Sequence, residues 1–144
     1  MINFSYYSLD KMIVDSESTH PDECCGFMFG HETDGIRFVT DARPVVNVKE
    51  GDRRRRFIIS PKDYMLAEKF AEDHGLLLLG IYHSHPEHPA IPSEHDRLSA
   101  QPYFSYAIIS VINKKFAGIR SWLLNDDSIF EEELITEKEH NTKN

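Results

Sequence analysis

One stretch of the chain, residues 76–96, decides both the fold and the chemistry, and it reads LLLLGIYHSHPEHPAIPSEHD. Its first seven residues form a continuous apolar run, which predicts a central strand buried on both faces. His83 and His85 follow, and because alternate side chains of a strand share one face, both imidazoles are expected to converge. Three prolines then predict a stiff loop. Ser93 is expected to begin a short helix, reaching about residue 101, with Asp96 in its first turn.

Two imidazoles and a carboxylate form a reasonable ligand set for zinc, with one position left open for water. We therefore predict one catalytic Zn²⁺ held by His83, His85 and Asp96. A second interpretation competes for the carboxylate. Ser93-x-x-Asp96 resembles a capping box, in which the acid would only bond the Ser93 amide. The nearby histidine pair favours the ligand interpretation.

A zinc ion with three protein ligands lowers the pKa of its water to about 7, but a general base must still take the proton. Glu23 is the best candidate, because it precedes an apolar run that predicts a strand beside the one bearing the histidines. Taken alone, a glutamate at this position would more often be a solvated turn residue. The residues by themselves leave this choice open.

Composition limits the classes of partner. A length of 144 residues predicts one compact domain. The net charge of −8 argues against a general nucleic-acid or anionic-membrane binder, since both require a basic surface. No apolar run approaches the ~20 residues of a membrane-spanning helix, and the N-terminus lacks signal-peptide features. We therefore expect a cytoplasmic protein.

The two cysteines, Cys24 and Cys25, are adjacent. Neighbouring cysteines rarely bridge each other, because the geometry of a disulfide is hard to meet across one peptide bond. A structural zinc site built from several thiolates is also excluded, so any metal must be held by histidines and carboxylates. Cys25 is expected to pack in the core as a small apolar residue.

Alternating strands and helices predict an α/β domain with a mixed sheet over residues 1–136, followed by an acidic, disordered tail at 137–144. One helix is expected from Ser8 to His20-Pro21. Another is expected from Ser60, the N-cap, to His74, with Gly75 as its stop. The strands are expected over residues 24–30, from 36 onward after an Asp-Gly turn, and over 45–48, 76–82, 106–112, 116–123 and 129–134.

The spacing of His83, His85, Ser93 and Asp96 resembles the JAMM motif of the MPN-domain (Mov34/JAB1) metallopeptidases. The segment 21–26, which contains Glu23, resembles the part of that family bearing a catalytic glutamate. Residues 56–63 and 103–111 are similar as well, so the resemblance extends over about residues 1–135. It implies an MPN (JAB1-like) fold, a mixed sheet flanked by helices that is related to cytidine deaminases.

The resemblance also implies roles. His83, His85 and Asp96 would bind zinc, Glu23 would hold the water and shuttle its proton, and Ser93 would donate to the oxyanion. Because it lacks long insertions and further cysteines, the chain resembles the minimal prokaryotic branch of this family. Members of that branch cleave peptide or isopeptide bonds at the C-terminal Gly-Gly tail of ubiquitin-like or sulfur-carrier proteins. The natural substrate and the oligomeric state stay open.

Two other functions compete. The first is a non-catalytic MPN-type interaction module that keeps the fold. The second is a zinc nucleobase deaminase, since residues 85–87 fit its H-x-E pattern, but the required downstream P-C-x-x-C is missing after Cys25. The basic run Arg53–Arg56 would either grip an acidic face of a carrier protein or form a solvated hairpin leading into a strand, and the hairpin is favoured. His88 and His95 are expected to be solvated loop residues.

Overall fold

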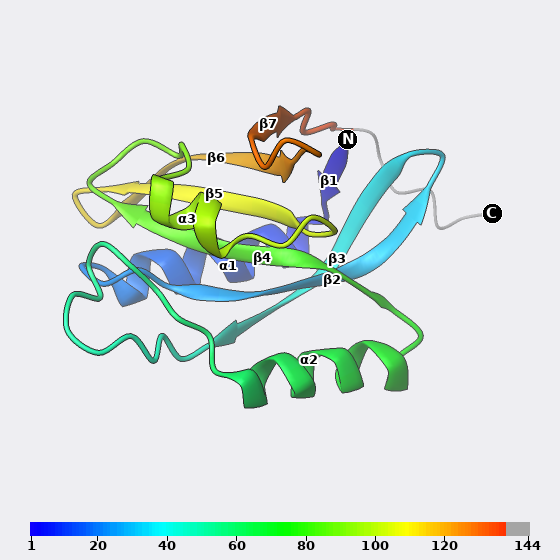
Figure 1. Ribbon diagram of the computed structural model, residues 1–144, viewed down its shortest axis with the longest axis horizontal. Coiled ribbons are helices and arrows are strands. Elements are labelled where there is room, and N and C mark those ends of the chain that lie inside the picture. Colours follow the sequence, from blue (N-terminus) through cyan, green and yellow to red (C-terminus); the bar gives the residue numbers. More distant parts are fainter. Residues whose placement is uncertain (138–144) are drawn as a thin grey trace.

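The structure of the protein, a computed structural model, describes residues 1–137 as one seven-stranded mixed sheet with helices packed against it (Figure 1). The order of the strands across the sheet is β1-β3-β2-β4-β5-β6-β7. The strands are β1 Ile2–Phe4, β2 Cys25–Thr33, β3 Ile36–Val45, β4 Leu77–Pro86, β5 Ser105–Ile112, β6 Lys115–Leu124 and β7 Phe130–Glu133. The helices are α1 Tyr6–Thr19, α2 Pro61–Asp73 and α3 Glu94–Ser99. The predicted α/β class with a mixed sheet is confirmed.

Strand β4 lies at the centre of the sheet, antiparallel to β2 and parallel to β5. His83 is opposite Cys25 of β2 on one side and Ile108 of β5 on the other. The predicted central strand is therefore confirmed, and it runs further than the apolar residues indicate. Both histidines lie within β4, which ends only at Pro86.

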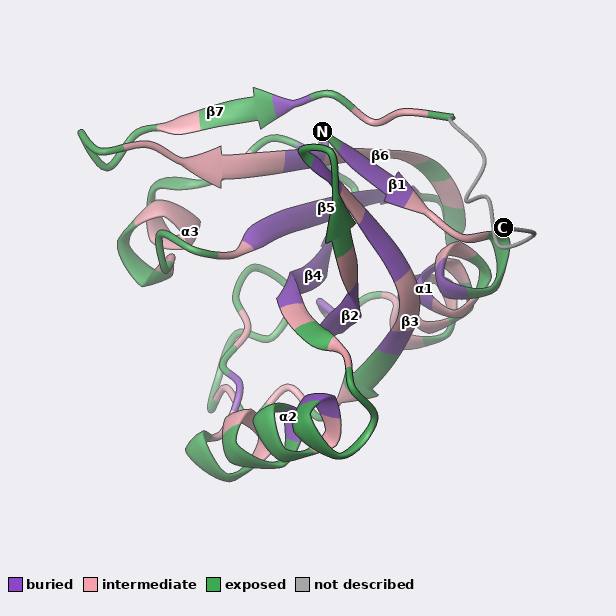
Figure 2. Ribbon diagram, turned by 90° about the vertical axis from the view of Figure 1, so that its right-hand side faces the viewer, coloured by how far each residue is buried: buried purple, intermediate pink, exposed green. Residues whose placement is uncertain are grey.

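The two ends of the sheet meet. The amide of Ile2 donates to the carbonyl of Leu134 at 3.0 Å, and the amide of Thr136 donates to the carbonyl of Ile2 at 2.8 Å. Ile2 thereby forms a parallel bridge with Ile135, and the sheet curls into a nearly closed cylinder (Figure 2). Strand β1 was not predicted from the sequence, because three residues are too few to show a periodic pattern.

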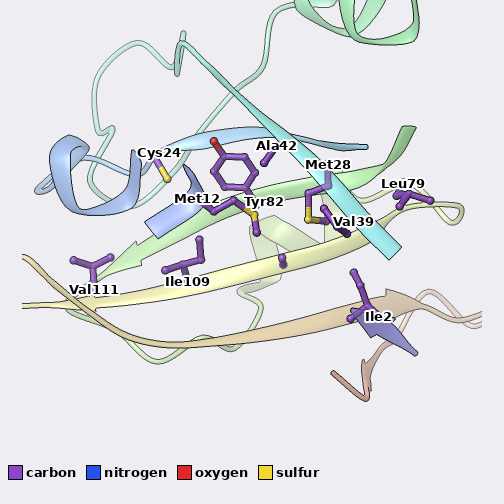
Figure 3. Packing of buried hydrophobic residues seen from close by; sticks show 11 residues of the cluster. Ile2, Met12, Cys24, Met28, Val39, Ala42, Leu79, Tyr82, Ile109 and Val111 are labelled. Carbon is purple, nitrogen blue, oxygen red and sulfur yellow. The ribbon is translucent and has the colours of Figure 1, made fainter. Parts of the chain in front are cut away.

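Each face of the sheet carries its own apolar core. On the face covered by α1, Met12 of the helix packs with Met28 and Tyr82 (Figure 3). On the other face, Phe27 and Ile81 pack in the cluster that contains the buried alanines of α2. Successive residues of β2 alternate between these cores, as the period of a strand requires. The same alternation places His83 and His85 on the face of Ile81.

The helix boundaries follow from their caps. The Ser5 hydroxyl accepts the amide of Ser8 at 3.0 Å, so α1 begins two residues earlier than predicted. The Ser8 hydroxyl is instead buried and lies 3.1 Å from the carbonyl of Val39. Helix α2 agrees with its prediction. The Ser60 hydroxyl accepts the amide of Asp63, and Gly75 ends the helix region with a positive φ of 64°.

The strand predicted over residues 45–48 is wrong. Strand β3 continues without interruption to Val45, and residues 46–60 form a loop. The side chain of Asn47 explains the difference, because it bonds backbone groups that would otherwise need a strand partner. Its Nδ2 donates to the carbonyls of Glu23 and Arg56, and its Oδ1 accepts the amides of Lys49 and Ile58.

The structure does not test two of the predictions, the disordered tail and the cytoplasmic location. The predicted tail, residues 137–144, lies outside the described residues except for Glu137. Among the described helices, none has the length and apolar character needed to cross a membrane. The cytoplasmic location stays a prediction.

Candidate active site

Three side chains meet where β4 ends and α3 begins. The Nε2 atoms of His83 and His85 lie 3.2 Å apart, and Asp96 Oδ2 lies 3.3 Å from the first and 3.1 Å from the second. Two ligand atoms at 2.0–2.1 Å from a tetrahedral zinc ion would be separated by about 3.3 Å. The described residues contain this one group of three side chains whose donor atoms could hold a metal ion. Its donor types and spacing fit zinc.

The orientation of His85 follows from the proline loop. Its Nδ1 lies 2.9 Å from the carbonyl oxygen of Pro89, which can only accept a hydrogen bond. The proton therefore sits on Nδ1, and the lone pair of Nε2 faces Asp96 and His83. The His83 ring is held differently, by stacking on Phe57 with ring centroids 4.6 Å apart.

The capping and ligand interpretations of Asp96 describe the same arrangement. The Ser93 hydroxyl accepts the amide of Asp96 at 3.0 Å, and Asp96 Oδ2 accepts the amide of Ser93 at 2.9 Å, so the capping box is formed. The oxygen that accepts the Ser93 amide is also the one nearest the two imidazoles. The cap thus aims the carboxylate at the histidines.

The protonation states suit metal binding. Burial lowers the pKa of His83, so its imidazole is neutral. Burial alone would raise the pKa of Asp96, but the neighbouring His83 and His85 and the amide of Ser93 outweigh it and hold that pKa below its usual range. A neutral imidazole and an ionised carboxylate are the forms that bind a cation.

Glu23 lies two residues before the start of β2, which pairs with β4, as the sequence predicts. Its amide donates to the carbonyl of Arg53 at 2.7 Å, and its own carbonyl accepts Asn47 Nδ2. The residue is only 3% exposed, and its Oε1 has no hydrogen-bond partner among the described residues. Burial, and after it the charge of Asp96, raises the pKa of Glu23 to about 9.

Two cavities flank the three clustered side chains. The catalytic cavity, as we name the first, contains Glu23, Ser93 and His85, so the structure brings the two predicted catalytic residues together. Its remaining lining residues are Arg55, His88, Pro89 and Ile91. The apolar cavity lies on the side of His83 and Asp96. Its other lining residues are Phe57, Ile58, Ile59, Tyr64, Ile81, His95, Ser99 and Tyr106.

Several of these lining residues were not expected from the sequence. His95, predicted to be solvated, is half-buried against the apolar cavity, while His88 is exposed at the catalytic cavity. The basic run 53–56 does not lead into a strand as expected, but turns within the loop 46–60 that precedes α2. The apolar residues after this run were the signal that could have indicated a cavity wall.

Cys25 is buried, as predicted, and its Sγ lies 3.8 Å from the carbonyl of Val45. Burial raises the pKa of its thiol to about 12. A thiol that keeps its proton at neutral pH is not a nucleophile.

Known proteins are similar to this chain in sequence and, where solved structures exist, in fold. Over 91 residues the chain is 37% identical to desampylase from Haloferax volcanii, which covers 62% of this chain and 63% of that protein. The match thus spans less than two thirds of that relative's length. The chain is also 26% identical to CysO-cysteine peptidase from Mycobacterium tuberculosis, over 86% of this chain and 83% of the relative.

A solved structure of a protein from Desulfitobacterium hafniense superimposes with a TM-score of 0.84 at 31% identity, covering 97% of this chain and 94% of that one. A family described as prokaryotic homologs of the JAB domain matches residues 7–125, which include every residue of the candidate site. The protein is therefore a member of the prokaryotic JAB-domain family.

Proposed function

We propose that the chain is a zinc-dependent peptidase that hydrolyses the peptide or isopeptide bond following the Gly-Gly tail of a ubiquitin-like or sulfur-carrier protein. One observation carries the proposal. The carboxylate of Glu23 is buried, has an oxygen without a partner among the described residues, and lines one cavity with Ser93 and His85. Relatives named desampylase and CysO-cysteine peptidase support the substrate class.

His83 and His85 through Nε2, and Asp96 through Oδ2, would hold the metal. A zinc ion with such ligands lowers the pKa of bound water to about 7 and polarises a substrate carbonyl. Two of these side chains are held in position by hydrogen bonds within the protein. The Pro89 carbonyl fixes the His85 ring, and the Ser93 amide fixes the carboxylate of Asp96.

Glu23 would transfer the proton. Its carboxylate takes a proton from water as the water oxygen joins the carbonyl carbon, and it returns that proton to the leaving nitrogen as the C–N bond breaks. The raised pKa of Glu23, about 9 in the metal-free protein, shows a group able to keep a proton in this environment. A bound cation would favour the carboxylate and bring the pKa down toward neutrality.

Ser93 would stabilise the developing oxyanion. Its hydroxyl oxygen already accepts the amide of Asp96, so the position of the hydroxyl group is fixed. The hydroxyl proton is not used in that bond, and no acceptor for it is found among the described residues. A donor held in place in this way costs no reorganisation when negative charge appears on the substrate oxygen.

The segment 57–59 would receive the tail of the carrier. Ile58 bonds Asn47 through its amide and Val48 through its carbonyl. The amides and carbonyls of Phe57 and Ile59 have no hydrogen-bond partner in the part of the chain that the structure describes. An extended Gly-Gly tail can add to such an edge as a strand, and the apolar cavity beside it would take the preceding side chains.

The test uses the zinc-loaded protein and a sulfur-carrier protein linked through Gly-Gly to a fusion partner. For Glu23→Gln we expect about one zinc per chain, as in the wild type, and hydrolysis reduced by at least about 100-fold. Glu50→Gln, an exposed glutamate in the loop 46–60, is the matched control and should behave as the wild type.

Equal hydrolysis by wild type and Glu23→Gln would remove Glu23 from the mechanism. A wild type that takes up no zinc would contradict the metal site. A wild type that binds zinc and the carrier but cleaves no linked substrate would identify the protein as a non-catalytic interaction module.

A further inference from the structure

The proline loop, residues 87–92, connects the two parts of the candidate metal site. His85 lies two residues before it on β4, and Asp96 follows it on α3. Because Pro89 and Pro92 have no N–H group, the loop has few backbone donors with which to fix its own path. Its carbonyl groups remain as acceptors, so the donors that they find decide where the loop lies.

Three consecutive carbonyl groups of the proline loop accept hydrogen bonds from side chains of three neighbouring strands. The Ser110 hydroxyl, on β5, donates to the carbonyl of His88 at 2.7 Å. The indole Nε1 of Trp122, on β6, donates to the carbonyl of Ala90 at 3.1 Å. The carbonyl between these two is the one that holds the ring of His85, at 2.9 Å from its Nδ1. The sheet thus fixes the loop on both sides of that carbonyl.

The register of the sheet places both donors on the face of the metal site. Ser110 is opposite His85 in the β4–β5 pair, and Trp122 is opposite Tyr106 in the β5–β6 pair. Since Tyr106 and Ser110 are four residues apart on one strand, their side chains share a face, and Trp122 shares it with them. Ser110 and Ala90 are both buried. Each bond therefore has one buried partner, and water competes little for it.

The direction of His85 Nε2 depends on the position of the Pro89 carbonyl. A hydrogen bond from an imidazole weakens steeply when its donor and acceptor lose their alignment. Each peptide unit is planar and rigid, so holding the carbonyls of residues 88 and 90 leaves the one between them little freedom. Replacing an outer partner of a histidine ligand typically lowers metal affinity by about 10- to 100-fold. The outer partner here is a backbone group, and the side chains that hold it can be replaced in its stead.

We propose that Ser110 and Trp122 are positioning residues for the candidate zinc ligand His85. They hold the proline loop so that the Pro89 carbonyl keeps the His85 ring turned, with Nε2 toward the ion. This inference rests on the metal site of the proposed function and is independent of the substrate. Neither residue is among the ligands or catalytic residues predicted from the sequence.

The test measures the Kd for zinc, by titrating the metal-free protein with zinc against a chromogenic chelator of known affinity. For Ser110→Ala we expect one zinc per chain and a Kd raised about tenfold. Ser110→Thr keeps the hydroxyl group and should regain most of the affinity. Its extra methyl group has space, because an added Cβ at Gly118, opposite Ser110 on β6, would have no atom within 4 Å.

Ser121→Ala is the matched control. Ser121 is also a buried serine of the sheet, and its hydroxyl donates to Glu133 Oε1 at 2.8 Å, away from the proline loop. The midpoint of urea denaturation should fall in Ser121→Ala as it does in Ser110→Ala, while the Kd for zinc stays at the wild-type value. A general loss of stability is thereby separated from an effect on the ligand.

Trp122 is the only tryptophan of the chain, so biosynthetic incorporation of benzothienylalanine changes this side chain alone. The benzothiophene ring has nearly the shape of indole but no N–H group. We expect it to raise the Kd for zinc about fivefold, because the carbonyl of Ala90 loses its donor.

Hydrolysis of the Gly-Gly-linked fusion at increasing free zinc completes the test. In Ser110→Ala the zinc concentration for half-maximal activity should rise about tenfold, as the Kd does, while the maximal rate stays within about twofold of the wild type. A wild-type Kd in Ser110→Ala or in the benzothienyl protein, or an equal rise in Ser121→Ala, would overturn the inference and leave the proposed function standing. The expected order of zinc affinities without hydrolysis in the wild type would instead count against the proposed peptidase, and a wild type that binds no zinc would overturn both.

Discussion

The amide of Ser93 donates to the same oxygen of Asp96, Oδ2, that lies 3.1 Å from His85 Nε2. The N-cap of α3 and the candidate metal site therefore share one carboxylate. Because the amide belongs to the backbone, substitution of the Ser93 side chain leaves this bond in place. The hydroxyl group and the amide of Ser93 can thus be separated by experiment.

Ser93→Ala should lower kcat by about 10²- to 10³-fold, as loss of an oxyanion donor does. It should also lower the free energy of unfolding by about 1 kcal/mol, because the amide of Asp96 loses its cap. The zinc content should stay near one per chain. Kinetics, urea denaturation and metal analysis measure the three effects. Ser93→Thr keeps a hydroxyl group and should restore most of the activity; a fully active Ser93→Ala would exclude the proposed role.

Asp96→Asn should abolish stabilisation by zinc. The wild type should gain about 2.7 kcal/mol in unfolding free energy when free zinc reaches 100 times its Kd. The variant loses the negative charge of the ligand set and should show little rise in melting temperature. Scanning calorimetry with and without zinc provides the measurement. Glu94→Gln, which changes an exposed neighbour that pairs with Arg97, should keep the zinc-dependent shift. A shift that persists in Asp96→Asn would place the metal elsewhere.

Glu23 should make the metal-free protein less stable as the pH rises. Its pKa is about 9 in the folded state and near 4.5 in the unfolded state, so the unfolded chain loses its proton first. The stability that the folded state owes to keeping Glu23 protonated is fully present below pH 4.5 and is lost as the pH rises toward 9. Each pH unit between these values costs up to about 1.4 kcal/mol.

Denaturation of the metal-free protein at several pH values, in the presence of a chelator, tests this effect. Glu23→Gln should show a smaller decrease in stability between pH 5 and 8 than the wild type. Parallel curves for the two proteins would mean that the carboxyl group ionises normally in the fold.

Tyr82→Phe should destabilise the fold through Asp15. The Tyr82 hydroxyl donates to Asp15 Oδ2 at 2.8 Å, joining β4 to α1 on the face away from the site. Burial raises the pKa of Asp15, and the bond from Tyr82 partly offsets that rise. Loss of a hydrogen bond to a charged group costs about 1.5–3 kcal/mol. A double-mutant cycle with Asp15→Asn measures the coupling, and additive effects would show that this bond contributes nothing.

The parts of the candidate site whose placement in the fold was predicted from the sequence depend on local patterns. The period of a strand places His83 and His85 on one face. The four residues from Ser93 to Asp96 contain the pattern that indicates the start of a helix. The position of Glu23 was harder to predict, because its proximity to the two histidines depends on which strands pair. The apolar run after it indicated a strand, and the register of β2 against β4 then brings it to the histidines.

The parts that were missed depend on contacts between distant residues. The apolar cavity is assembled from Phe57, Tyr64 and Tyr106, which lie on a loop, a helix and a strand. No local pattern indicates that they converge. The loop 46–60 was mistaken in part for a strand because its valines suit one, while the four hydrogen bonds of the Asn47 side chain stabilise a different path.

The junction of Ile2 with residues 134–136 has a consequence for the order of events during synthesis. Ile2 leaves the ribosome among the first residues, but its partners emerge more than a hundred residues later, which at roughly 5–20 residues per second takes on the order of 10 s. The strands and the helix that carry the candidate site are complete once β5 has emerged. The nascent chain can therefore assemble its catalytic residues on an open sheet, and closure of the cylinder is the last step.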